Sequence, residues 1–300
     1  MNRALNLFLA ARPAFLSITL LGCFIGIAIP GAHKESFSIN TLAIALAVLM
    51  HAAGNLFNDY FDHLNGSDQN NNSRITPFTG GSRYIQNKIL KPSHIFRFGL
   101  ILIAVSISIG LYICSQTTWL LIPIGLAGIT LAWSYSAPPL ELMAKGVLGE
   151  VAIAIAWSLI VIGFATLQTE GLAFKSIPIG VAYGLLVANI LLVNQMPDIE
   201  ADRQAGKLTL ASQISHRQAW IWYSSIYIAA YAFQFIGIYF FKIPLVTIVT
   251  VILLPIFVLC AKNISKYTGD NYQTRKLIVR NMVAAHLYCL LLCLGLLKGT

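Results

Sequence analysis

Two groups of acidic and amide side chains occur at helical spacing, each directly after a long apolar segment. The first is NDYFDHLNGSD, in which Asn58 and Asp62 are four residues apart. The second is NQMPDIEADRQAGK, in which Asn194, Asp198 and Asp202 repeat at intervals of four. Residues four apart lie on one face of a helix, separated by about 6 Å along its axis. Each group therefore predicts several oxygen ligands on one side of a helix.

Oxygen ligands at this spacing favour a bound cation. Carboxylates on adjacent turns repel each other, and a cation removes the repulsion. Mg²⁺ characteristically takes one or two carboxylates together with substrate phosphates. We expect the two groups to hold Mg²⁺ around a diphosphate, with these metal ligands: Asp59, Asp62, Asp68, Asp198 and Asp202. The alternative is that helix ends meeting water carry solvated Asp and Asn, which explains one group more easily than two at matching spacing.

Basic residues follow both acidic groups. The loop QNNNSRITPFTGGSRYIQNKILKP combines arginines with Gly80 and Gly81, and arginine suits phosphate oxygens while glycine allows close backbone approach. A polybasic loop against anionic lipid has the same appearance. The candidate diphosphate ligands are Arg74, Arg83, Lys145, Arg203, Lys207 and Asn194.

The composition shows what kind of chain must position these residues. It has 300 residues, 57% of them hydrophobic and 10% charged, and the mean hydropathy is +0.73. These values exclude an ordinary soluble or disordered protein, and continuous apolar runs exclude an outer-membrane barrel. The sequence predicts an all-α polytopic membrane protein. A span needs about 20 apolar residues, and nine ranges fit: 14–31, 40–61, 96–114, 118–136, 148–167, 177–197, 218–240, 243–261 and 281–298.

Charge distribution predicts the orientation of these spans. With the N-terminus in the cytoplasm, Lys and Arg residues lie on the cytoplasmic side except Lys34, Lys175, Lys242 and Lys298. The positive-inside rule therefore favours a cytoplasmic N-terminus and an external C-terminus. The net charge of +9 then follows from the orientation in the membrane and does not indicate a nucleic-acid partner. Both acidic groups fall on the cytoplasmic side.

The chain start and the cysteines allow other interpretations. The basic and apolar first residues resemble a signal peptide, but Arg12 and Pro13 interrupt them, so we expect an interfacial helix leading into a retained span. All five cysteines lie in apolar runs, which favours packing over disulfides or zinc. The six histidines share no spacing, and a haem role has no support.

At the acidic groups the sequence resembles the UbiA superfamily of intramembrane prenyltransferases. The family pattern N-D-x-x-D matches Asn58 to Asp62, and its second motif D-x-x-x-D matches Asp198 to Asp202. NDYFDHLNGSD, Gly80-Gly81, Gly149-Glu150 and DIEADRQAGKLTL are most similar to the 1,4-dihydroxy-2-naphthoate prenyltransferase branch, which makes demethylmenaquinone. One departure is Pro197, where that branch commonly has Arg.

The resemblance implies a single domain over 1–300, with nine helices around a central cytoplasm-facing cavity in a bacterial inner membrane. It implies Mg²⁺-dependent transfer of a polyprenyl group from its diphosphate to an aromatic acceptor. Asp62, Asp198 and Asp202 would be catalytic, Asn58 would orient phosphate, and Tyr135 would stabilise the allylic cation. Alternative acceptors are 4-hydroxybenzoate, homogentisate or a lipid alcohol. A transporter is the rival class, but transport would place carboxylates near the bilayer midplane.

Overall fold

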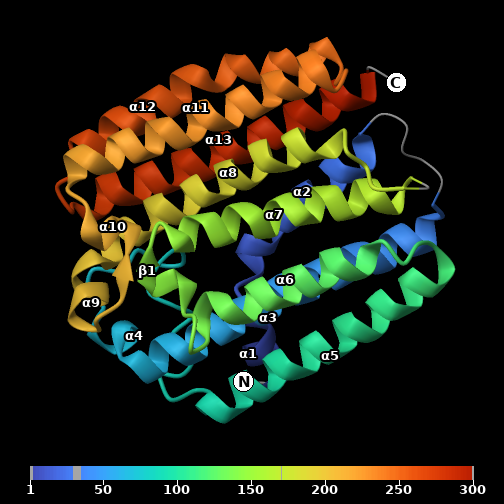
Figure 1. Ribbon diagram of the computed structural model, residues 1–300. Helices are drawn as coiled ribbons and strands as arrows, with labels where there is room; N and C mark the ends of the chain where they lie inside the picture. Colours follow the sequence, from blue (N-terminus) through green and yellow to red (C-terminus); the bar gives the residue numbers. More distant parts are fainter. Residues whose placement is uncertain (1–2, 30–34, 170, 299–300) are drawn as a thin grey trace.

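Long helices form most of this protein. The computed structural model describes residues 3–29, 35–169 and 171–298 (Figure 1). The long helices are α2 (Leu16–Ala28), α3 (Phe37–Asn65), α5 (Pro92–Gln116), α6 (Leu121–Ser136), α7 (Leu148–Leu167), α8 (Ser176–Gln195), α11 (His216–Phe240), α12 (Leu254–Ser265) and α13 (Asn271–Lys298). Each of the nine predicted ranges overlaps one of them, and the predicted helical fold class is confirmed.

Most of these helices are long and apolar enough to cross a membrane. Within the described residues seven pass on length and hydropathy, or eight if α1 (Arg3–Ala10) and the segment Pro13–Ala28, bent by 43°, form one span. Helix α6 is apolar but shorter, and α12 passes only together with the 3₁₀ segment η4 (Leu245–Leu253). The chain is an integral membrane protein. The number of nine spans stays a prediction, and the end of the first range falls on residues 30–31, outside the described residues.

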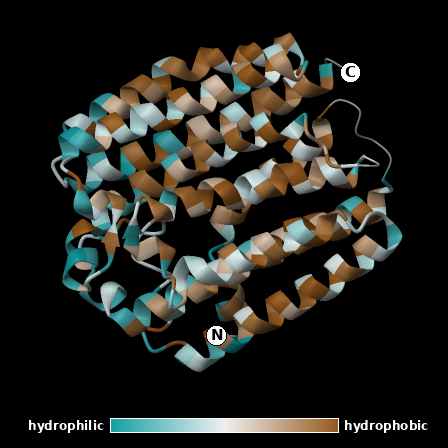
Figure 2. Cartoon of the chain, viewed as in Figure 1, coloured by the Kyte–Doolittle hydropathy of each residue, from teal (hydrophilic) through white to brown (hydrophobic). Residues whose placement is uncertain are grey.

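Short elements gather at one end of the bundle. They are η1 (Pro13–Phe15), α4 (Ser67–Asn70), η2 (Leu142–Ala144), β1 (Lys145–Gly146), η3 (Met196–Asp198), α9 (Ile199–Gln204), β2 (Leu208–Thr209) and α10 (Leu210–Gln213). The two strands pair in parallel, Lys145 with Leu208 and Gly146 with Thr209. Figure 2 shows hydrophilic residues concentrated at this end, whereas the helices leading away from it are mainly hydrophobic.

Small residues let the central helices approach closely. Helix α7 packs along α8 and α2. A Cβ added at Gly184 would clash with the Ala154 carbonyl, and one at Gly26 would meet the Phe164 side chain. Close van der Waals contact stabilises the packing of helices in lipid. These glycines permit such contact between α7 and its two neighbours, α2 and α8.

Hydrogen bonds between buried side chains join the C-terminal helices. Gln234 of α11 accepts from Tyr288 of α13 at 2.6 Å and from Thr250 of η4 at 3.0 Å. Asn281 of α13 accepts from Tyr223 of α11 at 2.8 Å, and donates to the Asn189 carbonyl of α8. Buried polar groups need such partners in an apolar medium, so this network fixes how α8, α11 and α13 sit together.

Candidate active site

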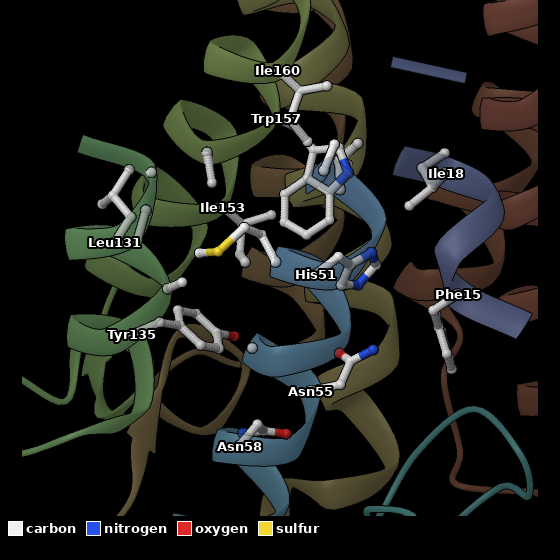
Figure 3. Close-up of a pocket in the computed structure, with 18 of the residues that line it drawn as sticks. Phe15, Ile18, His51, Asn55, Asn58, Leu131, Tyr135, Ile153, Trp157 and Ile160 are labelled. Atoms are coloured by element: carbon white, nitrogen blue, oxygen red, sulfur yellow. The ribbon is translucent and has the colours of Figure 1, made fainter. Parts of the chain in front are cut away.

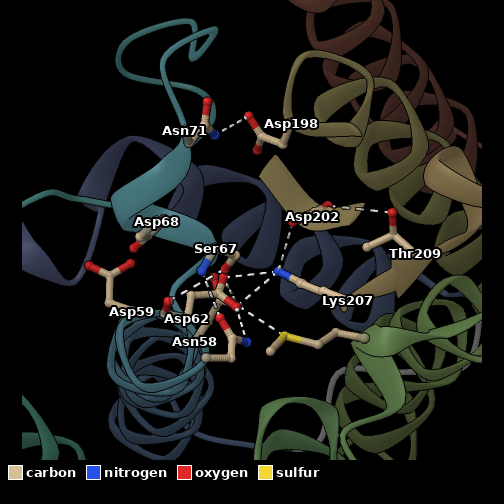
Figure 4. Close-up of polar contacts among 12 residues, drawn as sticks. Asn58, Asp59, Asp62, Ser67, Asp68, Asn71, Asp198, Asp202, Lys207 and Thr209 are labelled. Carbon is tan, nitrogen blue, oxygen red and sulfur yellow. Dashed lines mark hydrogen bonds and ion pairs between the residues drawn. The ribbon is translucent and has the colours of Figure 1, made fainter. Parts of the chain in front are cut away.

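Both predicted acidic motifs meet at the end of the bundle where the short elements gather (Figure 4). Asp62 comes from the last turn of α3, and Asp202 comes from α9. Lys207 lies between them, with Nζ 2.9 Å from Asp62 Oδ1, 3.0 Å from Asp62 Oδ2 and 3.7 Å from Asp202 Oδ1. All three side chains are largely buried. Burial alone would lower the pKa of Lys207, but the charges of Asp62 and Asp202 outweigh it and raise the pKa.

The carboxylates of the first motif have different surroundings. Asp62 lines the cavity described below, where Asn58 donates to its Oδ2 at 3.0 Å. Asp59 is 2% exposed, forms an ion pair with Arg12, and accepts from the Ser82 amide at 3.1 Å. Asp59 is not among the residues that line the cavity. Its oxygens are therefore already matched by a cation and an amide, and Asp62 is the better-placed ligand.

A sharp turn brings Asp68 back toward the motif. Gly66 caps the C-terminal end of helix α3, and its φ of +84° suits glycine. Helix α4 follows, and its Asp68 is 3% exposed. Gln86 donates to Asp68 Oδ2 at 3.2 Å. Burial, and then the charges of Asp62 and Asp59, raise the pKa of Asp68 to about 7, although Arg12 and Lys207 oppose the shift. Burial is the largest cause, and the neighbouring carboxylates add to it.

The loop after α4 holds the second motif. Asn71 donates to Asp198 Oδ1 at 2.7 Å, and the Gly80 amide donates to Asp198 Oδ2 at 3.2 Å. Asp202 accepts a weak bond from Thr209 at 3.4 Å. Helix α8 tightens into η3 at Pro197, yet Asn194 lines the same cavity as Asp198 and Asp202, as their spacing predicts.

The acidic end opens into a cavity of about 560 Å³. Its polar lining includes Asp62, Asp68, Asp198, Asp202 and Lys207. The rest is mainly apolar and comes from α3, α5, α6, α7 and α8. One continuous space therefore joins a carboxylate-rich mouth to an apolar interior.

A polar stripe on α3 runs from the acidic end into this interior (Figure 3). His51, Asn55 and Asn58 occupy one face of α3, with Tyr135 across from the asparagines and Trp157 next to His51. Their spacing places Asp62 on the same face. His51 Nδ1 lies 2.8 Å from the Thr19 hydroxyl, and the His51 ring meets the Trp157 ring edge-on at 5.0 Å. The indole Nε1 of Trp157 is buried and has no hydrogen-bond partner within the described residues. The interior can therefore receive a ligand with both rings and oxygen atoms.

Of the predicted diphosphate ligands, the structure brings Lys207 and Asn194 to the cavity lining. The others lie outside it. Lys145 is exposed and donates to the Pro139 carbonyl at 3.4 Å, and Arg203 is exposed and donates to the Ser212 carbonyl at 2.8 Å. Arg83 donates to the Asp68 carbonyl. Arg74 is half-buried, and its side chain packs beside Gly80.

Sequence reasoning missed three residues of the site. Arg12 lines the cavity and contacts Asp59 and Asn58, but the sequence indicated only a charged break before Pro13. Asn71 lies in a run of asparagines that gave no reason to choose one of them. His51 could have been found from its spacing, because it lies seven residues before Asn58 on the motif face of the helix.

The oxygen-rich lining suits a hard cation. Within the described ranges, no three Asp, Glu, His or Cys side chains already form a compact metal cluster. Lys207 occupies the space between Asp62 and Asp202. The four carboxylates that line the cavity nevertheless exceed its one lysine and one arginine, and each has lone pairs beyond those used in hydrogen bonds. The donor set and its excess negative charge fit Mg²⁺.

Comparison with known proteins identifies the family. The UbiA prenyltransferase family matches residues 19–294, so the chain belongs to this family and is a prenyltransferase. A "1,4-dihydroxy-2-naphthoate octaprenyltransferase" of Bacillus subtilis is 28% identical over 246 residues, covering 78% of this chain and 77% of the relative. A "UbiA prenyltransferase domain-containing protein 1" of Dictyostelium discoideum is 30% identical over 269 residues, covering 84% and 78%.

Solved structures show the same fold at low sequence identity. A UbiA homolog from Archaeoglobus fulgidus, solved bound to DMAPP and Mg²⁺, has a TM-score of 0.61 and 16% identity, and the match covers 100% of both chains. A structure described as digeranylgeranylglyceryl phosphate synthase has a TM-score of 0.66 and 14% identity, covering 99% of this chain and 100% of that one.

Proposed function

We propose that this prenyltransferase uses Mg²⁺ to transfer a polyprenyl group to an aromatic acceptor, most specifically 1,4-dihydroxy-2-naphthoate. The observation that carries the proposal is the continuous cavity with carboxylates at one end and apolar walls beyond them. A prenyl diphosphate has the same polarity, a charged head on an apolar tail. The names of the Bacillus relative and the Archaeoglobus structure support the acceptor and the metal.

Different residues of the site would bind the metal and the diphosphate. Asp62, Asp68, Asp198 and Asp202 would hold Mg²⁺, which when bound neutralises charge on the diphosphate. Lys207 would donate to a diphosphate oxygen, and the Asn58 and Asn194 amides would orient it. Arg12 keeps Asp59 neutralised and thereby limits the repulsion of an anionic substrate. Asp59 is then a supporting residue of the site.

Transfer begins when the allylic C–O bond breaks and its electron pair leaves with the diphosphate. The ring carbon of the acceptor that bears the carboxylate attacks the allylic carbon, and loss of CO₂ restores the aromatic ring. The direct product is the quinol form of demethylmenaquinone. Apolar walls exclude water from the cation, and the ring faces of Tyr135 and Trp157 stabilise its charge. His51 and the unpaired Trp157 Nε1 would bind the acceptor oxygens.

The two competing functions make different predictions. Another acceptor, such as 4-hydroxybenzoate, homogentisate or a lipid alcohol, would keep the diphosphate site and change the partners of His51 and Trp157. A transporter would need charged groups along a path through the bundle, whereas the carboxylates here gather at one end. We further propose a single domain in a bacterial inner membrane, with the acidic end and N-terminus cytoplasmic.

The test is mass spectrometry of lipids formed by the purified chain in nanodiscs. Reactions contain Mg²⁺, farnesyl or geranylgeranyl diphosphate, and one acceptor at a time. Prenylated naphthoquinol that disappears with EDTA and with Asp198→Asn supports the full proposal. A product from a different acceptor alone refutes the naphthoate assignment. Flux through proteoliposomes without any prenylated product refutes the proposed reaction.

A further inference from the structure

A second groove lies on the lipid-facing side of the bundle, away from the carboxylates. It runs between α12 and α13 and encloses about 500 Å³. Its lining is Ile256, Leu259, Tyr272, Arg275, Lys276, Val279, Arg280 and Val283. The residues from α13 recur at helical spacing. On this face of the helix Arg275 and Lys276 come first, and Val279, Arg280 and Val283 follow. The basic end lies at the same end of the bundle as the active site (Figure 1).

Among the residues that the structure describes, the cations of this groove have no acidic partner. Within the described ranges, no ion pair involves Arg275, Lys276 or Arg280. The carboxylate nearest in sequence, Asp270, instead accepts from the Gln273 amide at 2.9 Å. Lys276 Nζ lies 5.6 Å from the centre of the Tyr272 ring. An anion in this groove would therefore meet several unneutralised positive charges.

The helix dipole does not stabilise these cations, which follow the first turn of α13. The N-terminal end of a helix carries positive partial charge, which favours acidic residues and disfavours basic ones. The first turn of α13 contains no acidic residue, and Arg275 and Lys276 follow within the next turn. The positive-inside rule accounts for basic residues at this end, but it requires no groove and no apolar floor.

The apolar part of the groove matches an acyl chain. Leu259, Val279 and Val283 are 42%, 39% and 49% exposed on the outer surface of the bundle. Val279 and Val283 lie further along α13 than Arg275 and Lys276, and Leu259 of α12 lines the same groove. The groove therefore has a charged end and an apolar end in the order in which a membrane lipid presents its phosphate and its chains.

We propose that this groove is a binding site for an anionic phospholipid. Arg275, Lys276 and Arg280 bind the headgroup phosphate, and Ile256, Leu259, Val279 and Val283 contact one acyl chain. Basic pockets between membrane helices recognise anionic headgroups in this way, and arginine adds bidentate contacts to phosphate. The site is independent of the transfer reaction and can be tested without activity.

The experiment is native mass spectrometry of the full chain released from micelles that contain phosphatidylglycerol or phosphatidylcholine. We expect the wild type to retain phosphatidylglycerol, and the triple variant R275Q/K276Q/R280Q to bind it about tenfold more weakly or worse. The matched control K91Q/R97Q/R217Q removes the same charges from exposed positions outside the groove. It should retain the lipid as the wild type does.

A second variant separates shape from charge. Val279→Trp fills the groove and leaves all three cations, so we expect it to weaken phosphatidylglycerol binding as well. Circular dichroism and gel filtration establish that each variant is folded. Equal loss in the groove and control triples, or equal retention of the two lipids by the wild type, refutes the site. Equally strong competition by soluble glycerol phosphate refutes the acyl-chain contact.

Discussion

The ammonium of Lys207 lies within 3.0 Å of both carboxylate oxygens of Asp62, although 145 residues separate the two in sequence. Lys207 follows the second acidic motif and Asp62 belongs to the first, so this ion pair joins the two halves of the site. It also gives the cavity mouth a buried positive charge.

Replacing Lys207 should slow transfer more than replacing any exposed lysine. Lys207→Gln removes a buried charge from the cavity mouth, and loss of one such electrostatic contact typically costs about 10²–10³ in rate. Single-turnover assays at saturating donor measure the effect. Lys266→Gln, at an exposed position after α12, should leave the rate unchanged. A larger loss for Lys145→Gln than for Lys207→Gln would contradict the assignment.

Metal binding should depend on Asp202 and not on its neighbour Glu200. Both belong to α9, but Asp202 lines the cavity, whereas Glu200 is exposed and accepts from Gln204. We expect Mg²⁺ with inorganic diphosphate to raise the melting temperature of the wild type and of Glu200→Gln. Asp202→Asn should show a much smaller shift, as should Asp62→Asn. An undiminished shift in both Asp variants would remove the basis of the metal site.

Breaking the pair between Arg12 and Asp59 should destabilise the protein. Arg12→Gln leaves the buried Asp59 carboxylate without its cation, which typically costs about 3–5 kcal/mol. Asp59→Asn in the same chain removes the uncompensated charge, so the double variant should recover part of the lost stability. Thermal unfolding in detergent measures all three variants. Strictly additive losses would show that the two residues do not interact.

A methyl group at Gly81 should disturb Asp68. A Cβ at this position would lie 2.8 Å from Asp68 Oδ1, and the φ of +72° is unfavourable for alanine. We expect Gly81→Ala to weaken the Mg²⁺-dependent thermal shift and to reduce turnover. Gly171→Ala is the control, since nothing lies within 4 Å of its added Cβ and its φ is ordinary. Similar behaviour of the two variants would exclude a special role for Gly81.

Helical spacing predicts which carboxylates share a face, because spacing determines which helix face a residue occupies. Asp62, Asp198 and Asp202 follow that rule and line one cavity. Spacing could not show that Asp59 is paired, because Arg12 comes from a separate segment at the start of the chain. The same limit applies to the basic residues. Lys207 lies between α9 and β2 and lines the cavity. Lys145 lies in β1, the strand that pairs with β2, and is exposed.

The helical ranges were also predictable, since each apolar run is long enough to identify a helix. The break between α1 and the following segment was predictable as well, because Arg12 and Pro13 interrupt the apolar run, and the chain bends there by 43°. The shortness of α6 was not predictable, because it depends on packing and turn geometry. The polar network of Gln234, Tyr288 and Thr250 was invisible in the sequence for the same reason. Its members are ordinary residues in apolar runs, and only the fold brings them together.

The loop that carries Asn71 and Gly80 donates hydrogen bonds to Asp198, and this contact has a consequence for how the protein is made. Asn71 is synthesised 127 residues before Asp198, and Asp62 is synthesised 145 residues before Lys207. A ribosome that has produced only the first helices therefore delivers Asp62 to the membrane before its cation, Lys207, exists. The acidic end is completed only when the second motif emerges and folds against the first, so competence for chemistry is acquired late in biogenesis.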